Sequence, residues 1–142
     1  MALAPEQPSD QLRGAAFHEA GHVVVARFLG LHVREIEIGM NGDDASGRAE
    51  IGCADQLSFI DQIAVCAAGR EAQDMFDAPT DKYAGFGDYG RIVNLMVGLS
   101  KEDSFTLRNA GYARAREILN MHRSEVEQLA ERLMRERQLK TI

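Results

Sequence analysis

The sequence predicts a mainly helical α+β fold with one small β-hairpin. Apolar side chains recur at steps of three and four residues over much of the 142-residue chain, which is the period of helices packed on one face. One short stretch, His32 to Ile38, is instead rich in β-branched residues and partly alternating, as expected of a strand. Segments rich in Gly, Pro, Asn and Asp separate these elements and predict the turns between them.

Length and composition favour a single domain. A chain of 142 residues buries about two-thirds of its unfolded surface and needs no disulfide to be stable. We expect residues 1–9 to be loose and residues 10–142 to form the domain. Residues 1–11 lack the charged and apolar regions of a signal peptide, and no later run approaches the length of a membrane span. We therefore expect a soluble protein with no direct membrane insertion.

The cysteines indicate the cellular compartment, and the charge pattern excludes some classes of binding partner. Cys53 and Cys66 have no C-x-x-C spacing, so free thiols in a reducing cytoplasm are expected and cysteine ligation of a metal is not. The net charge is −6, and basic residues are interspersed among acidic ones. This pattern argues against a nucleic-acid partner and against a polyanionic substrate.

The first helix is predicted to begin after an N-cap at Ser9 or Asp10 and to stop at Gly30, a residue type favoured just past a helix end. The segment from Leu12 to Leu29 is apolar nearly all round. A helix of that kind is buried on every side.

This helix carries the pattern H-E-x-x-H at His18, Glu19 and His22. Residues four apart project from one helix face, so the two histidines can coordinate one metal ion. Glu19 is rotated about 100° from His18 and can still reach a water held on that metal, as a general base. Zinc with three protein ligands keeps a position for water and lowers its pKa to about 7. The pattern predicts zinc-assisted hydrolysis.

The buried setting strengthens the metal interpretation. Two imidazoles and a carboxylate on a buried helix are costly to desolvate without partners, and one metal ion is a partner for both imidazoles. A pair of hydrogen-bonded core histidines is the alternative, since H-E-x-x-H arises by chance in about one such chain in a hundred.

A hairpin and a second helix follow. Asn41-Gly42 is a strong turn signal, and a second strand alternates from Arg48 to Cys53, which predicts a hairpin with a long polar loop. The edge of its first strand, His32 to Ile38, is a candidate for holding an extended substrate by strand addition. The second helix begins after Ser58, whose spacing to Asp61 fits a capping box, and runs to Phe76.

A third helix is predicted after a loop over residues 77–87, and it supplies a candidate third metal ligand. Asp88 stands at its beginning and shares the core-facing side with Ile92, Leu95 and Leu99. A carboxylate that points into a core requires a cation. Spacing alone leaves three rivals open: Asp74, Asp77 and Asp81.

The last forty residues carry the longest helical signal, which starts near Ser100 and has its expected kink at Gly111. From Ala115 onward a stripe of apolar positions repeats at steps of four and three, and His122 lies in it. We interpret His122 as a partly buried packing residue rather than a ligand, and we interpret His32 in the same way.

Four segments resemble the FtsH-type zinc metallopeptidases. Residues 17–26, Phe-His-Glu-Ala-Gly-His-Val-Val-Val-Ala, are similar to that family's HEAGH helix, and residues 68–74 are similar to its GGRAAEE helix. Residues 85–93, which include Gly-Phe-Gly-Asp, resemble its G-x-x-D-L-x-x-A-T segment, and residues 114–133 resemble its C-terminal RAKEIL…LAEALL helix. The four matches keep the family's order over about residues 12 to 138.

The resemblance implies a helical zincin-like peptidase domain in which Asp88 is the third zinc ligand. Members of that family carry a membrane anchor and an ATPase module before the peptidase and form hexamers. These 142 residues contain no apolar run long enough for an anchor and no phosphate-binding loop, so we expect a peptidase domain that lacks both. Gly90 is expected to loosen the helical turn after Asp88. Asp74 stands where the family has a glutamate, so its shorter side chain has less reach for any role in supporting the metal ligands.

These features predict a free-standing zinc endopeptidase that uses His18, His22 and Asp88 as ligands and Glu19 as base. We expect it to cleave unfolded or flexible polypeptides, either alone or with a separate ATPase partner, and as a homo-oligomer if the family's assembly is kept. The alternative is a catalytically idle helical interaction module that retains a structural metal site. Metal-assisted hydrolysis of a non-peptide bond is a third hypothesis.

Overall fold

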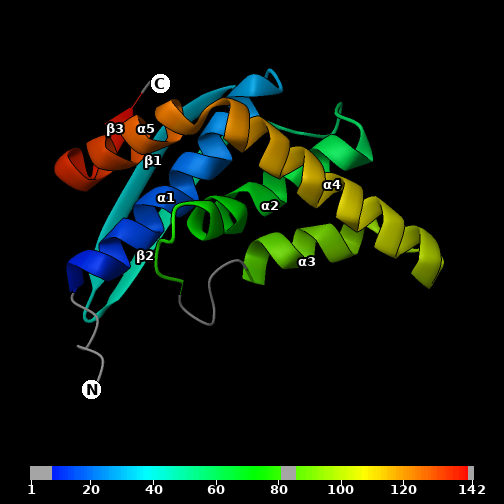
Figure 1. Ribbon diagram of the computed structural model, residues 1–142, viewed down its shortest axis with the longest axis horizontal. Coiled ribbons are helices and arrows are strands. Elements are labelled where there is room, and N and C mark those ends of the chain that lie inside the picture. The colour runs from blue at the N-terminus through cyan, green and yellow to red at the C-terminus, as the bar shows by residue number, and fades with distance from the viewer. Residues whose placement is uncertain (1–7, 81–85, 141–142) are drawn as a thin grey trace.

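Helix α1 (Pro8–Phe28) runs through the middle of the molecule, with a sheet on one side and helices on the other (Figure 1). It belongs to a computed structural model that describes residues 8–80 and 86–140. Several side chains around its axis, such as Ala16, Ala20 and Val25, are completely buried. The predicted buried helix is therefore confirmed, but it begins at Pro8, before both predicted N-cap residues. Residues 8 and 9, which were expected to be loose, are thus helical, and residues 1–7 lie outside the described residues.

A three-stranded antiparallel sheet covers one side of α1. Strands β1 (Val33–Asn41) and β2 (Asp44–Ile51) form the predicted hairpin, although pairing continues to Asn41 and Asp44, so the connection is much shorter than the expected long polar loop. Gly42 occupies this turn with a φ of 68°, a conformation that suits glycine. Most side chains of β2 are exposed to solvent, so backbone pairing with β1 is the main interaction near the turn.

The third strand, β3 (Gln138–Lys140), was not predicted from the sequence. It pairs with β1, which gives the strand order β2-β1-β3. Arg137 adopts a left-handed φ of 67° after the last helix and turns the chain back, so that Leu139 is buried opposite Ile36. The expected free edge at His32 to Ile38 is therefore wrong, since β1 lies in the centre of the sheet. The edge strands of the sheet are β2 and β3.

Helix α2 (Phe59–Met75) packs directly on α1. Ser58 caps it as predicted and accepts a hydrogen bond from the Asp61 backbone N–H at 3.1 Å, but the Asp61 carboxylate accepts from Arg114 rather than closing a capping box. Small residues bring the two helices close together. A Cβ on Gly21 would lie 2.5 Å from the Ala68 carbonyl oxygen, so only glycine fits at this position.

Three more helices complete the fold: α3 (Phe86–Leu95), α4 (Lys101–Met121) and α5 (Arg123–Glu136). Ser100 is the N-cap of α4, as expected. The chain turns at Gly98, so Leu99 lies beyond α3 and is exposed, contrary to its predicted place on the core-facing side. The long C-terminal helix is divided at His122 and not at Gly111, where α4 continues and packs closely on Ile63.

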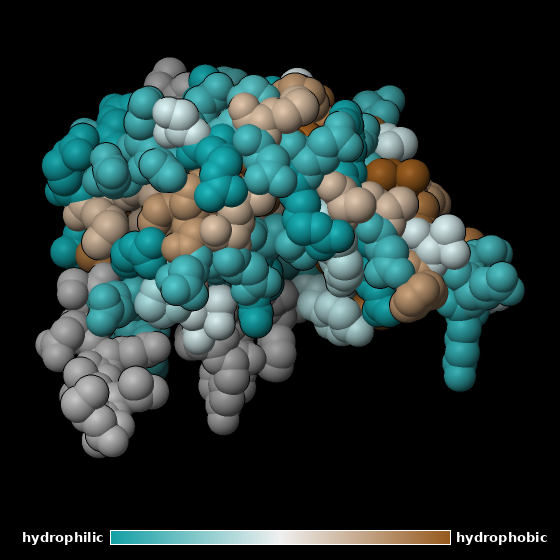
Figure 2. All heavy atoms as spheres, viewed as in Figure 1, coloured by the Kyte–Doolittle hydropathy of each residue, from teal (hydrophilic) through white to brown (hydrophobic). Residues whose placement is uncertain are grey.

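The surface in this view is mostly hydrophilic, and its apolar atoms lie in several separate groups (Figure 2). Helices α3 and α4 expose several apolar side chains. The large apolar residues exposed on these helices and between them are Tyr89, Val93, Val97, Leu99, Phe105 and Met121. Within the described ranges, no helix combines the length and the apolar character that a membrane span needs.

Candidate metal centre

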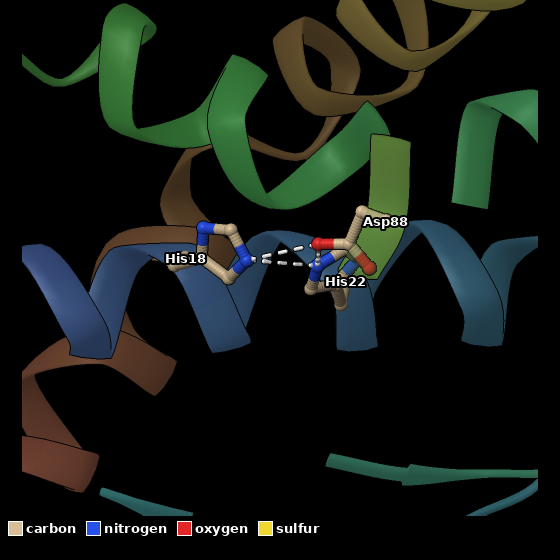
Figure 3. A group of neighbouring side chains, drawn as sticks. All are labelled: His18, His22 and Asp88. Carbon is tan, nitrogen blue, oxygen red and sulfur yellow. Dashed lines mark hydrogen bonds and ion pairs between the residues drawn. The ribbon is translucent and has the colours of Figure 1, made fainter. Parts of the chain in front are cut away.

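Helix α1 presents His18 and His22 toward α2, one turn apart on one face (Figure 3). Their Nε2 atoms lie 3.1 Å from each other, and both side chains are largely buried. The local i, i+4 spacing and the burial of α1 are sufficient to bring these two atoms together.

Asp88 approaches the same point from the first turn of α3 (Figure 3). Its Oδ2 atom lies 3.2 Å from His18 Nε2 and 3.0 Å from His22 Nε2. Within the described part of the chain, these three residues form the one group of His, Cys, Asp and Glu side chains close enough to share a metal ion. The structure thus brings together the three residues that the sequence selects.

The rival carboxylates lie elsewhere. Asp74 is exposed and pairs with Arg70 at 3.4 Å, and Asp77 contributes its backbone carbonyl to Arg13. Asp81 lies outside the described residues. Neither Asp74 nor Asp77 belongs to the metal-binding group, and the same holds for the two free cysteines.

The outer nitrogens of both imidazoles are engaged by acceptors. His22 Nδ1 lies 2.7 Å from the Val65 carbonyl oxygen, which can only accept, so Nδ1 carries the proton. His18 Nδ1 lies 2.7 Å from Gln73 Oε1, and the Gln73 amide donates to the Pro79 carbonyl at 2.9 Å, which fixes its orientation. His18 Nδ1 is therefore also the protonated nitrogen.

This arrangement leaves both Nε2 atoms of the neutral imidazoles as acceptors. Together with Asp88 Oδ2 they form three acceptor atoms within 3.0–3.2 Å of one another, which is unfavourable unless a cation lies among them. Ligands in a tetrahedron about 2.05 Å from zinc lie about 3.3 Å apart. The residues fit a zinc ion, with outer hydrogen bonds of the kind that orient metal-binding histidines.

Gly69 of α2 leaves the space that these atoms need. A Cβ at this position would lie 2.5 Å from His22 Nε2 and 2.6 Å from His18 Nε2. Any larger residue would push the imidazoles out of place. The close packing of α2 on α1 therefore forms the back of the site, and glycine at position 69 makes it possible.

Glu19 lies beside the histidines and under strand β2. Its side chain is buried, and a Cβ on Gly47 would come within 2.8 Å of Glu19 Cγ. Burial raises the pKa of Glu19, and the neighbouring His22 and His18 partly oppose this effect. The carboxyl group is thus held next to the metal-binding atoms in a partly desolvated environment.

In the metal-free cluster, Asp88 and His22 shift each other's pKa values toward the charged forms. Burial alone would raise the pKa of Asp88, but the contacts with His18 and His22 outweigh it and hold that pKa well below its usual range. Burial alone would lower the pKa of His22, but Asp88 and Glu19 outweigh it and raise that pKa. Without a metal, protons supply part of the positive charge that the three acceptors require.

An open cleft of about 870 Å3 leads to these residues. One wall is formed by the free edge strand β2 from Gly47 to Ile51 and the segment that follows it to Asp55, and the other by the face of α3 that carries Asp88. Cys66 lines the cleft, and burial raises the pKa of its thiol to about 11. This thiol stays protonated at neutral pH, as expected for a cysteine that does not ligate a metal.

Several contributors were not identified from the sequence. Gln73 supports His18, whereas Asp74, the neighbour considered for such a role, points away into solvent. Gly69 and the Val65 carbonyl were missed because their roles depend on how α2 packs on α1. The one available signal was Gln73 itself, a polar residue on the buried side of α2.

The remaining histidines lie outside the cluster. His122 is partly buried, as predicted, with Nδ1 3.0 Å from Glu125 and its ring packed against Phe28 at 5.2 Å. His32 is exposed just before β1, so its interpretation as a partly buried packing residue is wrong. Neither histidine belongs to the metal-binding group.

Neither a scan against models of known protein families nor a search of curated proteins returned a match for this chain. The interpretation of the site therefore depends on its residues and their geometry.

Proposed function

We propose that this protein is a zinc-dependent endopeptidase that hydrolyses peptide bonds in unfolded or flexible polypeptides. One observation carries the proposal: two imidazole nitrogens that are acceptors when the rings are neutral and one carboxylate oxygen converge beside a buried glutamate, at the floor of an open cleft. His18, His22 and Asp88 hold the metal in this account, and Glu19 is the catalytic base.

Bound zinc supplies Lewis-acid polarisation of the scissile carbonyl and a more acidic water. Glu19 then takes a proton from the attacking water as its oxygen bonds to the carbonyl carbon. The same carboxyl group returns that proton to the leaving amine nitrogen as the carbon–nitrogen bond breaks. Because burial raises the pKa of Glu19 above its usual value, this carboxylate accepts a proton from water more readily than a solvated glutamate does.

The free edge of β2 favours an extended polypeptide as the substrate. An unpaired strand edge offers backbone donors and acceptors to a peptide that adds as a further strand, and residues of β2 line the cleft next to Glu19. A folded protein offers no free extended segment to such an edge. Delivery by a separate ATPase partner extends this account to folded substrates. Assembly into a homo-oligomer is a separate part of the proposal. The free thiols of Cys53 and Cys66 suit the cytoplasm.

The direct test compares wild-type protein with Glu19→Gln on a fluorogenic library of unstructured peptides. We expect both proteins to bind one equivalent of zinc and the variant to lose cleavage by roughly 100-fold or more, as expected when a general base is removed. Equal cleavage by both proteins, with equal zinc, would contradict the assignment of Glu19.

The second candidate is an interaction module in which the metal has only a structural role and holds α3 against α1. The apolar surface over α3 and α4 favours it, since Tyr89, Val93 and Phe105 are about half exposed there. A structural site does not need Glu19. Zinc binding with no cleavage by either protein, together with loss of stability on chelation, would select this alternative.

A further inference from the structure

The charged side chains of the cleft are divided between its two walls. Glu50 and Asp55 lie on the wall formed by β2 and the segment after it, and Arg91 lies on the α3 wall. Glu19 and Asp88 are at the floor. The substrate would therefore meet carboxylates on one side and a guanidinium on the other.

Arg91 is fixed in this position by the same helical geometry that places the third metal-binding residue. It follows Asp88 by three residues, about one turn, and the cleft side of α3 continues through Asn94 and Leu95. Its neighbour Ile92 is buried against the core and sets the rotation of the helix. The Arg91 side chain thus lies along the cleft, about one turn from the metal centre.

Arg91 differs from the other cation in the cleft because it has no ionic partner among the described residues. Arg48 Nε donates to Glu37 Oε1 at 2.6 Å, so the charge of Arg48 is compensated by a carboxylate. The charge of Arg91 is nevertheless felt inside the cleft, since it opposes the burial effect on the pKa of the Cys66 thiol. A guanidinium that is free in the apo protein keeps its planar set of donors available for a ligand.

We propose that Arg91 binds a substrate carboxylate and makes the cleft selective for peptides that carry one near the scissile bond. A guanidinium pairs with a carboxylate through two parallel hydrogen bonds, and the exposed Arg91 side chain is accessible to a ligand that enters the open cleft. The carboxylate is supplied either by an Asp or Glu side chain or by the C-terminus of the peptide. This inference rests on the proposed function, because it presumes that the cleft receives peptides.

The test measures binding separately from cleavage. Dye-labelled peptides, identical except for Glu or Gln at one position and for a free or amidated C-terminus, are titrated with zinc-loaded Glu19→Gln protein and followed by fluorescence anisotropy. The same titrations are repeated after adding Arg91→Gln, Arg91→Lys, or Arg135→Gln. Arg135 is an exposed arginine of α5 outside the cleft, so its variant makes the same charge change elsewhere.

We expect carboxylate peptides to bind about tenfold more tightly than their neutral matches, which is typical of a charge-assisted hydrogen bond. Arg91→Gln should remove this preference, Arg91→Lys should keep part of it, and Arg135→Gln should leave it unchanged. The Glu/Gln and free/amidated pairs identify which carboxylate is bound. Absence of the preference in the parent protein, or its survival in Arg91→Gln, would overturn the inference. Failure of the proposed function would give a different result: the protein that keeps Glu19 would bind carboxylate peptides selectively but would not cleave them.

Discussion

Helix α1, which carries His18 and His22, and helix α3, which carries Asp88, are held by the rest of the fold to very different extents. The sheet, α2 and α5 all pack on α1, and both of its imidazoles have fixed outer hydrogen bonds. Helix α3 packs mainly on α2 and has ten residues, of which Ile92 is the buried apolar anchor. Its outer face, with Tyr89 and Val93, is exposed.

The residues of the metal centre are therefore held in place to different extents. The histidine pair and Glu19 are positioned by the core before any metal binds, whereas the third ligand comes from a lightly anchored helix. Metal binding therefore contributes to the docking of α3 as well as to chemistry. Changes behind the histidines should disrupt the site, and changes on the outer side of α3 should be tolerated.

The largest difference in zinc affinity is expected between two glycine substitutions, one in α2 behind the histidines and one in α3. Gly69→Ala places a Cβ about 2.5 Å from both Nε2 atoms, so zinc affinity should fall by more than about 100-fold, the upper end of the effect of losing an outer-shell partner. Gly90→Ala on α3 meets nothing within 4 Å and should stabilise that helix by up to about 1 kcal/mol.

Competition with a chromogenic chelator measures both affinities, and circular dichroism checks that each variant is folded. The comparison predicts zinc affinity in Gly90→Ala that equals or exceeds that of the wild type. Wild-type affinity in folded Gly69→Ala would show that the space behind the imidazoles is not part of the site.

A smaller effect is expected from the outer hydrogen bond of His18. Gln73→Met keeps the volume of the side chain but removes the acceptor for Nδ1 and the donor to Pro79. Zinc affinity should fall by roughly 10- to 100-fold. The matched change Arg70→Met, on the exposed side of α2, should leave affinity unchanged. Equal affinities for the two variants would contradict the role given to Gln73.

The smallest effect is a dependence on pH. Because the pKa of His22 is raised above 6.5 in the metal-free fold, protonated His22 contributes stability that is fully present below pH 6.5 and is lost as pH rises through the folded value. Urea unfolding from pH 5.5 to 8.5 should show metal-free protein losing this contribution, while zinc affinity rises because protons compete less. Zinc affinity that does not change over this range would contradict ligation by His22.

The sequence was sufficient for those parts of the site that depend on local periodicity. His18, Glu19 and His22 share one turn of a helix whose burial is evident from its composition, and their mutual placement follows. Periodicity made Asp88 a candidate because it shares a face with Ile92, but it left rival carboxylates open, and only the resemblance to the FtsH-type family singled Asp88 out. The same argument failed at Leu99, because the chain leaves the helix before it and turns at Gly98.

Features that depend on contacts between distant segments could not be predicted. The strand β3 has three residues and forms only because β1 is there to pair with it, so its local pattern carries no signal. Gly69, Gln73 and the Val65 carbonyl acquire their roles from the packing of α2 against α1. The identity of the edge strand likewise required the strand order, which moved the proposed substrate edge from β1 to β2.

Zinc-edge X-ray absorption on protein loaded with one equivalent of zinc tests the central claim most directly. The account predicts nitrogen and oxygen scatterers at about 2.0–2.1 Å, including two imidazoles, and no sulfur at about 2.3 Å although Cys66 lines the same cleft. The imidazole signal should be lost in His18→Ala and His22→Ala. A sulfur ligand, or an unchanged spectrum in those variants, would contradict the assignment of His18, His22 and Asp88 as the metal centre.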